Sequence, residues 1–159
     1  MKKFNFKKSL VAGKLGEDIF AAKMCEDIFA AKMCDKVIRL DGRKSDFKLI
    51  ADGKLIELKS EYYDKEKTPN FFIERYSNID KKSAGGPWQA LEKGSDYFVE
   101  FFPINNYIWV FNTKSLVERL DILIKSLNLG EIINDTHVSA GYLVKRELLQ
   151  DLVIQEKEI

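Results

Sequence analysis

The stretch of residues 45–60 constrains the fold of this chain more than any other part. Residues 47–51 and 54–60 are rich in apolar side chains, and each has the length of a short strand. Asp52-Gly53 lies between them, and this pair favours a two-residue turn because such turns require positive φ values. The stretch therefore predicts two antiparallel strands that are joined as a tight hairpin.

The alternation of side chains along the second strand decides which of its residues share a face. Successive side chains of a strand point to opposite faces, so Glu57 and Lys59 share one face while Ile56 and Leu58 share the other. Asp46 lies near the open end of the hairpin, beside the part of the second strand that carries these charges. We therefore expect Asp46, Glu57 and Lys59 to converge within reach of one metal ion.

These residue types suit the hydrolysis of a phosphodiester. A hard divalent cation binds oxygen ligands, neutralises charge on the phosphate and lowers the pKa of a bound water. Asp46, Glu57 and the backbone carbonyl of Leu58 would supply ligands for Mg²⁺, which Mn²⁺ can replace. Lys59 would orient or deprotonate the attacking water, or stabilise the transition state.

The spacing of these residues resembles the core motif of a nuclease superfamily. Asp46, ten intervening residues and then Glu57-Leu58-Lys59 are similar to the D-x(n)-E-x-K core of the PD-(D/E)XK nucleases, which include restriction enzymes, phage exonucleases and archaeal Holliday-junction resolvases. The resemblance covers residues 13–110. It implies an α/β fold of the restriction-endonuclease-like kind, with a central mixed β-sheet flanked by helices. Ser45 replaces the proline of the motif, a departure that many members share.

The resemblance implies further site residues on two helices. Small resolvase-like members carry a metal-binding glutamate on the first helix, and both Glu17 and Glu26 are candidates for it. We favour Glu26, because it keeps the shorter connection to Asp46. In related nucleases the helix after the ExK strand often brings a lysine or glutamine to the active site, and Gln89 is the candidate for this role.

A perfect tandem repeat lies within the predicted first helix. Residues 17–25 and residues 26–34 both read EDIFAAKMC, which indicates a recent or engineered duplication. Nine residues turn an α-helix by about 900°, so the apolar side chains of the two copies face opposite directions. One copy then needs a partner outside the core, and we expect a homodimer, a higher homo-oligomer or domain exchange. The alternative is a long helix that is buried on both sides.

Basic residues gather in three groups that bracket the acidic site. The first fourteen residues carry five lysines, and two further groups occur within 39–44 and 65–82. This distribution fits a site that holds a polyanion, whereas each group alone also fits a solvated surface. The candidate nucleic-acid contacts are Arg43, Lys44, Lys81, Lys82 and Trp88. Trp88 would stack on a base from a flexible basic loop, or would instead anchor that loop as a buried side chain.

Composition excludes several other classes. The chain of 159 residues has two cysteines and one histidine, His137, which are too few for a Cys/His zinc site, an HNH nuclease or a Ser-His-Asp hydrolase. At this length we expect one domain, 1–159. No apolar run reaches the roughly 20 residues of a membrane span, and the basic N-terminus lacks the features of a signal peptide. We therefore expect a cytoplasmic location and no membrane partner.

The remaining patterns predict additional strands and helices. Further strands are expected at 36–40, 71–76, 96–102 and 107–111, with an edge strand at 141–144. Helices are expected from Gln89, at 114–127 with Thr113 as the cap, and at 146–153. The second half of the chain shows no catalytic pattern.

The function that the sequence supports best is a metal-dependent nuclease that hydrolyses DNA, with RNA as the alternative substrate. The small size, without an added recognition domain, favours an endonuclease that is directed by structure or is weakly specific for sequence. A nucleic-acid-binding module without activity is one alternative. A structural protein whose charges only solvate a sheet face is another. A helicase or polymerase is excluded by the length and by the absence of a phosphate-binding loop motif.

Overall fold

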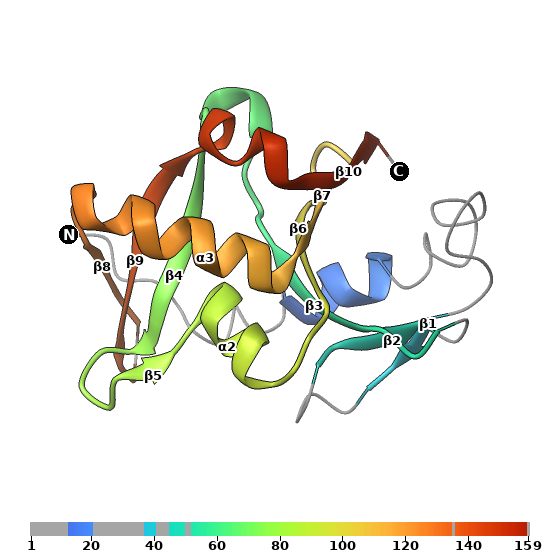
Figure 1. Cartoon of the computed structure of the whole chain (residues 1–159), viewed down its shortest axis with the longest axis horizontal. Helices are drawn as coiled ribbons and strands as arrows, with labels where there is room; N and C mark the ends of the chain where they lie inside the picture. Colours follow the sequence, from blue (N-terminus) through green and yellow to red (C-terminus); the bar gives the residue numbers. More distant parts are fainter. Residues whose placement is uncertain (1–12, 21–36, 41–44, 50–51, 135, 159) are drawn as a thin grey trace.

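The computed structural model describes residues 13–20, 37–40, 45–49, 52–134 and 136–158. Within these ranges the chain forms two β-sheets and a few helices, which is an α/β architecture (Figure 1). The larger sheet is mixed, as the sequence predicts, whereas the second sheet was not foreseen. No helix in the described ranges is long and apolar enough to cross a membrane.

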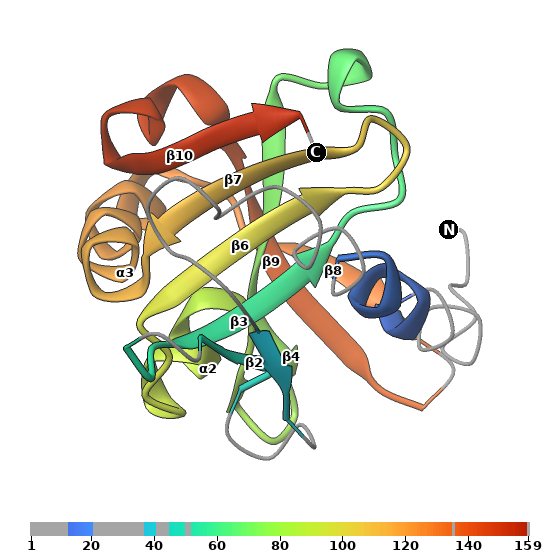
Figure 2. The same cartoon turned by 90° about the vertical axis from the view of Figure 1, so that its right-hand side faces the viewer.

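Six strands build the larger sheet, and they lie side by side in Figure 2 with the second sheet behind them. In spatial order they are β1 (Val37–Arg39), β2 (Phe47–Leu49), β3 (Leu55–Ser60), β6 (Tyr97–Phe102), β7 (Tyr107–Asn112) and β10 (Val153–Glu158). β3 and β6 run parallel, and the other neighbours in this sheet are antiparallel. Because parallel neighbours need a crossover connection, the chain leaves the sheet between β3 and β6.

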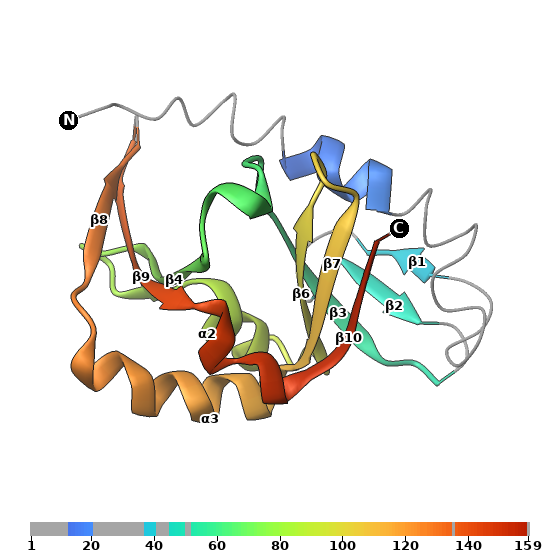
Figure 3. The ribbon, with the colours of Figure 1, turned by 90° about the horizontal axis from the view of Figure 1, so that it is seen from above.

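The second sheet is antiparallel, and helices pack between it and the first. Its strands in spatial order are β5 (Ser83–Ala84), β4 (Asn70–Asn78), β9 (Val138–Lys145) and β8 (Gly130–Ile133). The helical segments are residues 13–20, α2 (Gly86–Glu92), α3 (Thr113–Leu123) and the 3₁₀ turns η1 (Lys65–Lys67), η2 (Ile124–Ser126), η3 (Arg146–Leu148) and η4 (Gln150–Leu152). Figure 3 shows α2 between the two sheets and α3 beside it.

The six-stranded sheet carries an apolar cluster on each face. The helix at 13–20 covers the first cluster, which comprises Phe20, Phe47, Leu49, Ile56, Val99, Phe101, Ile108 and Val110. The second cluster joins the opposite face to α2, α3 and the second sheet, through residues that include Phe71, Trp88, Phe98, Phe102, Trp109 and Leu116. β6 therefore contributes apolar side chains to both clusters.

β2 and β3 form the predicted hairpin in a different register. Lys48 pairs with Leu55, whereas a two-residue turn at Asp52-Gly53 would pair Lys48 with Glu57. Gly53 still adopts the positive φ of +76° that favours glycine. The shift amounts to two residues, and because the side-chain period is also two, every side chain keeps its predicted face.

Two predictions for the C-terminal part were wrong. Residues 141–144 belong to β9, which lies between β4 and β8 instead of at an edge. Residues 146–153 do not form one helix, because they fold into η3 and η4 and then enter β10, which pairs with β7. The strand Val153–Glu158 completes the sheet beside β7, and this pairing overrides the helical spacing.

α3 agrees with the predicted helix except at its ends. Asn112 is the N-cap, because its Oδ1 accepts a hydrogen bond from the backbone N–H of Ser115 at 3.0 Å, whereas Thr113 is the first helical residue and is buried. The α-helix ends at Leu123, and η2 continues the predicted range. Leu116 and Leu120 face the core, as the apolar stripe predicts.

The beginning of the first helix packs on the sheet as expected. Phe20 is fully buried, and Ile19 packs against the same cluster. Ile19 and Phe20 of the first repeat copy therefore face the six-stranded sheet. Residues 21–36 lie outside the described ranges, so the consequences of the second copy, including oligomerisation, stay a prediction.

Gly130 and Gly141 are Cα partners in the second sheet, but they differ in how closely other atoms pack around them. A Cβ at Gly141 would lie 2.5 Å from the carbonyl oxygen of Ile73 and 2.7 Å from the ring of Phe72, whereas the nearest atom to a Cβ at Gly130 is 3.7 Å away. Gly141→Ala is expected to lower the free energy of unfolding by about 1–3 kcal/mol, and Gly130→Ala by much less. Urea denaturation measures both variants, and equal effects would contradict the packing described.

Candidate functional site

Asp46 precedes β2 and bonds to β3 through both its backbone and its side chain. Its N–H donates to the carbonyl of Ile56 (3.1 Å), and its Oδ2 accepts from the N–H of Leu58 (2.8 Å). Burial raises the pKa of Asp46 above its ordinary value, and the Glu17 carboxylate adds to this, while the Leu58 hydrogen bond opposes it. The Leu58 contact fixes the Asp46 carboxylate beside the ExK strand.

Glu57 on β3 is the second half-buried carboxylate. Its side chain is 13% exposed, and its Oε1 accepts from Lys93 Nζ at 2.7 Å. Its Oε2 is buried and has no hydrogen-bond partner in the described part of the chain. Burial raises the pKa of Glu57, Asp46 raises it further, and Lys93 lowers it in part. The charge of Asp46 therefore acts on Glu57 across the hairpin.

The backbone of Leu58 faces Asp46. In an extended strand the N–H and C=O of one residue point to the same edge, so the Leu58 carbonyl faces the edge on which Asp46 lies. Ile56, two residues earlier, also bonds to Asp46 from this edge. Asp46, which precedes β2, therefore lies beside the part of β3 that contains Glu57 and Leu58, the other two residues with predicted oxygen donors.

Lys59 shares a face with Glu57, but its nearest charges are other carboxylates. Its Nζ lies 3.9 Å from Glu61 Oε1, and its Cα partner on β6 is Glu100. Burial lowers the pKa of Lys59, yet Glu61, Glu74 and Glu100 together raise it above the ordinary value. The charged form of Lys59 is therefore favoured by acidic residues that sequence reasoning missed.

Glu100 is the most deeply buried of these acidic residues. Its side chain is 1% exposed, and its Oε2 has no hydrogen-bond partner among the residues described. Burial raises the pKa of Glu100 well above the ordinary value, and Glu61 adds to the shift. A signal was present in the sequence, because Glu100 is a single anion inside the apolar strand YFVEFF. Glu61 carried a weaker signal, two residues beyond Lys59.

The first helix approaches the end of β3 through Gly16. A Cβ at this position would collide with the side chains of Ser60 and Tyr62, so the close contact requires glycine. Burial raises the pKa of the Tyr62 hydroxyl, and the hydrogen bond with the Gly16 backbone opposes this shift. The contact places the next residue of the helix, Glu17, at the border of the site.

Glu17 acts on the site through its charge. Its carboxylate pairs with Arg39, and it contributes to the raised pKa of both Asp46 and Glu57. Glu26, the favoured candidate of the sequence analysis, lies outside the described residues. The choice of Glu26 therefore stays a prediction, while Glu17 is the first-helix glutamate that the structure places near the carboxylates.

α2 brings Lys93 against the motif. Gln89 donates its Nε2 to the carbonyl of Ala84 (3.3 Å), whereas Lys93, at the C-cap one turn later, contacts Glu57. The i, i+4 spacing puts Gln89 and Lys93 on one helix face. The predicted role of Gln89 stays a prediction, and Lys93 is the residue of that face that sequence reasoning missed.

Trp88 is a core residue, so the prediction that it stacks on a base was wrong. Its side chain is 6% exposed, its indole N–H donates to Asp121 Oδ1 (2.9 Å), and the Arg75 guanidinium lies 4.6 Å above its ring. The segment is also not a loop at this point, because α2 begins at Gly86 and turns Trp88 inward. The alternative of a buried anchor is the one observed.

The predicted basic contacts are partly described. Lys81 and Lys82 are exposed in the turn between β4 and β5, where Asn78 Oδ1 accepts from the Lys81 N–H at 3.0 Å. Lys82 adopts a positive φ of 51° in this turn. Arg43 and Lys44 lie outside the described residues. A role for all four in binding nucleic acid stays a prediction.

Ser45 has a contact that a proline could not make. Its Oγ lies 2.6 Å from Ser95 Oγ, and both residues are buried. This hydrogen bond links the entry to β2 with the segment that leads into β6. A serine at position 45 therefore has a local structural explanation.

The described residues contain no group of three or more His, Cys, Asp or Glu side chains that could hold a metal ion. The predicted donors are two carboxylates and one backbone carbonyl, and Mg²⁺ often binds through one or two carboxylates while it keeps several waters. The magnesium site therefore stays a prediction.

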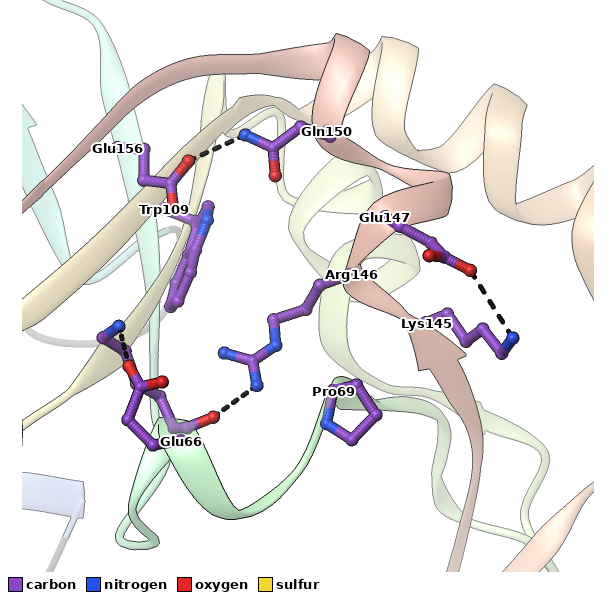
Figure 4. Close-up of a pocket in the computed structure, with 9 residues that line it drawn as sticks. Glu66, Pro69, Trp109, Lys145, Arg146, Glu147, Gln150 and Glu156 are labelled. Atoms are coloured by element: carbon purple, nitrogen blue, oxygen red, sulfur yellow. Dashed lines mark hydrogen bonds and ion pairs between the residues drawn. The ribbon is translucent and has the colours of Figure 1, made fainter.

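A pocket of about 410 Å³ lies elsewhere, between η1 and the C-terminal segments (Figure 4). Trp109 forms part of its wall. Its polar side chains pair with one another or with backbone, through Lys145 and Glu147 (3.4 Å), Gln150 and Glu156 (2.7 Å), and Arg146 and the carbonyl of Lys65. Arg146 connects η3 to η1, and Gln150 connects η4 to β10, so these contacts are explained as structural links.

Comparisons with models of protein families, with curated proteins and with solved structures found no match to this chain. Its function is therefore inferred from the residues of the site.

Glu100→Gln tests the burial of this carboxyl group. A carboxyl group with a raised folded pKa contributes full stability below its unfolded pKa, and this contribution is lost as the pH rises toward the folded pKa. The glutamine avoids this loss, so the variant should be more stable than wild type by at least about 1 kcal/mol at pH 8, and by less at pH 5. Urea denaturation at both pH values measures the difference. An advantage that is independent of pH, or one shared by the exposed control Glu118→Gln, would refute the assignment.

Proposed function

We propose that this chain is a metal-dependent nuclease of the PD-(D/E)XK type, which hydrolyses phosphodiester bonds of DNA. The observation that carries the proposal is the hydrogen bond from the N–H of Leu58 to the Asp46 carboxylate. It joins the separated parts of the motif, because Leu58 lies between Glu57 and Lys59. The aspartate, the glutamate and the lysine therefore occur together on the hairpin that the motif requires.

The order of the elements supports the proposal. A helix at 13–20 precedes three antiparallel strands, β1, β2 and β3, and α2 then leads into β6, which is parallel to β3. The resemblance implies this order of a helix, an acidic hairpin, a second helix and further strands. β4 and β5 come before α2 in the chain and belong to the second sheet, so they add no strand to the six-stranded sheet.

The donor atoms fit a hard divalent cation. Burial raises the pKa of Asp46 and of Glu57, and Glu57 Oε2 is a buried oxygen without a hydrogen-bond partner in the described part of the chain. A cation near both carboxylates would reduce their repulsion and fill the vacant acceptor. Asp46, Glu57 and the Leu58 carbonyl would hold Mg²⁺ or Mn²⁺, and waters would complete the coordination.

Residues of this chain supply the remaining chemistry. When bound, the metal ion neutralises phosphate charge and lowers the pKa of a bound water. Lys59 stabilises the negative charge that develops on the phosphate, since its acidic surroundings favour the ammonium form over a proton-accepting amine. Lys93 keeps Glu57 oriented through its 2.7 Å contact. Glu17 adds a further carboxylate at the border of the site.

The nucleic acid would contact the turn that follows β4 as well as the hairpin. Lys81 and Lys82 are exposed there, and the same strand carries Glu74, whose charge acts on Lys59. Contacts to phosphate through lysines carry no sequence information, which favours an endonuclease with weak sequence specificity. A homodimer or a higher oligomer, formed through the duplicated helix, would allow both strands to be cut.

A nucleic-acid-binding module without activity is the second candidate. The ion pair with Lys93 favours it, because this contact occupies Glu57 Oε1, an oxygen that a metal ion would also approach. Such a module would bind DNA in a salt-sensitive manner and would cut neither strand.

Loss of either motif charge should abolish most of the cleavage. Glu57→Ala removes a metal donor and Lys59→Ala removes a cation, so each is expected to slow Mg²⁺-dependent cleavage by at least about 100-fold. The measurement uses labelled duplex, single-stranded and branched DNA, with RNA in parallel, in Mg²⁺ or Mn²⁺. Glu118→Ala and Lys114→Ala are matched controls on the exposed side of α3 and should cut at the wild-type rate. Salt-sensitive binding without cleavage by the wild type would favour the binding module.

Metal binding should also stabilise the fold. At a concentration of about 100 times its Kd, Mn²⁺ should raise Tm by about 5 °C or more. The shift should be larger at pH 8 than at pH 5, because the raised pKa of Asp46 and Glu57 leaves more of the protonated form at low pH. Asp46→Asn should lose most of the shift, while Asp80→Asn, at an exposed turn residue, should keep it. Thermal denaturation with and without the ion decides the outcome.

A further inference from the structure

Three glutamates surround Lys59, and the proposed cleavage chemistry uses none of them. Glu61 directly follows β3, and its N–H still donates to the carbonyl of Phe101 on β6 (2.8 Å). Glu100 lies on β6, and Glu74 lies on β4 of the second sheet. All three carboxylates raise the pKa of Lys59. We call Glu61, Glu74 and Glu100 the acidic cluster.

Local packing gives no reason for a carboxylate at position 100. Phe98 and Phe102 share its face of β6 and both belong to the apolar cluster beside α2 and α3. A carboxyl group at this place loses its hydration, and an apolar side chain of similar volume would commonly be as stable or more stable. Residues that break the packing rule are expected at functional sites. Glu100 therefore requires an explanation from its neighbours.

The strand register supplies that explanation. Lys59 and Glu100 are Cα partners in the parallel pair β3–β6, so their side chains lie next to each other on one face. Glu61 is two residues beyond Lys59, which returns it to the same face. The Lys59 ammonium is 3.9 Å from Glu61 Oε1, a distance that allows an ion pair but is too long for a hydrogen bond. The ammonium is therefore attracted to this carboxylate without being locked to it.

Vacant acceptors complete the argument. Glu61 Oε1 and Glu100 Oε2 are both buried without a hydrogen-bond partner in the described part of the chain. A lysine ammonium has three donors on a flexible stem of four carbons. It could therefore bond to both oxygens after a small rotation, and no other cation is needed to satisfy them.

We propose that Glu61 and Glu100 are positioning residues, which hold the Lys59 ammonium in place for its contact with the phosphate. This inference rests on the proposed nuclease function and adds two residues to it. Without the two carboxylates, the lysine stem would sample several rotamers, and the productive position of the ammonium would be populated less. Glu74 adds a further attraction from the second sheet.

The first experiment needs no nuclease activity. Lys59→Met removes the ammonium and keeps an unbranched stem, so in the full chain it should lower Tm by several degrees because it leaves buried carboxylates uncompensated. In a Glu61→Gln, Glu100→Gln background the same change should shift Tm little. If the double variant does not fold, the Lys59→Met change is measured in the single Glu100→Gln background instead. Equal shifts in all backgrounds would overturn the pairing.

The second experiment follows single-turnover cleavage of DNA. Glu61→Gln and Glu100→Gln should each slow cleavage by about 10-fold, while the DNA Kd and the Mn²⁺ concentration for half-maximal rate stay unchanged. In the Lys59→Ala background neither should slow the residual rate further. Glu61→Asp, which keeps the charge, should recover part of the rate. A slowing of the same size with and without Lys59 would show a merely structural role and overturn the proposal.

The two experiments separate this proposal from the nuclease assignment. If the wild type cuts and no coupling to Lys59 is found, the positioning role alone fails. If the wild type cuts no nucleic acid under any metal condition, the nuclease function fails, and with it the catalytic purpose of the pairing. Coupled Tm shifts would in that case still support the contact between Lys59 and the two carboxylates.

Discussion

β3 and β6 lie side by side and run in the same direction, and most other features of the molecule depend on this pairing. A parallel pair cannot be closed by a hairpin, so the chain from β3 must travel away and return before it can add β6. The returning segment contains β4 and α2, which bring Glu74 and Lys93 to the site. The same register sets Glu100 opposite Lys59. One backbone pairing therefore explains both the second sheet and the concentration of charge.

The site combines an excess of buried negative charge with too few cations to balance it. The site has two cationic side chains, Lys59 and Lys93. Its carboxyl groups are those of Asp46, Glu57, Glu61, Glu74 and Glu100. Burial raises the pKa of several of these acids, so the folded state is stabilised when they take up protons or gain a cation. A fold selected for stability alone would place apolar groups there. This charge imbalance is an observation in support of the proposed metal site.

Local features could be predicted from the sequence, whereas contacts set by distant register could not. Alternation around Glu57 and Lys59 follows from the strand period, and the Asp46 contact follows from the hairpin, even with the turn two residues longer. The pairing of Lys59 with Glu100 depends on the alignment of strands separated by the whole crossover, which no local pattern fixes. The same holds for the contact of Lys93 with Glu57.

The incorrect prediction for Trp88 could have been avoided from the sequence. Pro87 in the first turn of α2 is a typical helix start, and it would have placed Trp88 within a helix instead of a loop. The C-terminal segment failed for another reason, since the helical spacing of 146–153 was real but weaker than the gain from a strand beside β7. There the pairing with β7 outweighed the local preference for a helix.

The outer strands of the large sheet have a consequence for how copies of the molecule can meet. β10, at one edge, ends in the polar run Gln155, Glu156, Lys157 and Glu158, and β1, at the other, is three residues long. Short edges and charged edges both resist the addition of a foreign strand. The sheet is therefore protected against growth by stacking strand on strand into fibrils. An assembly of this protein would use helices or loops for its contacts and would add no strand to this sheet.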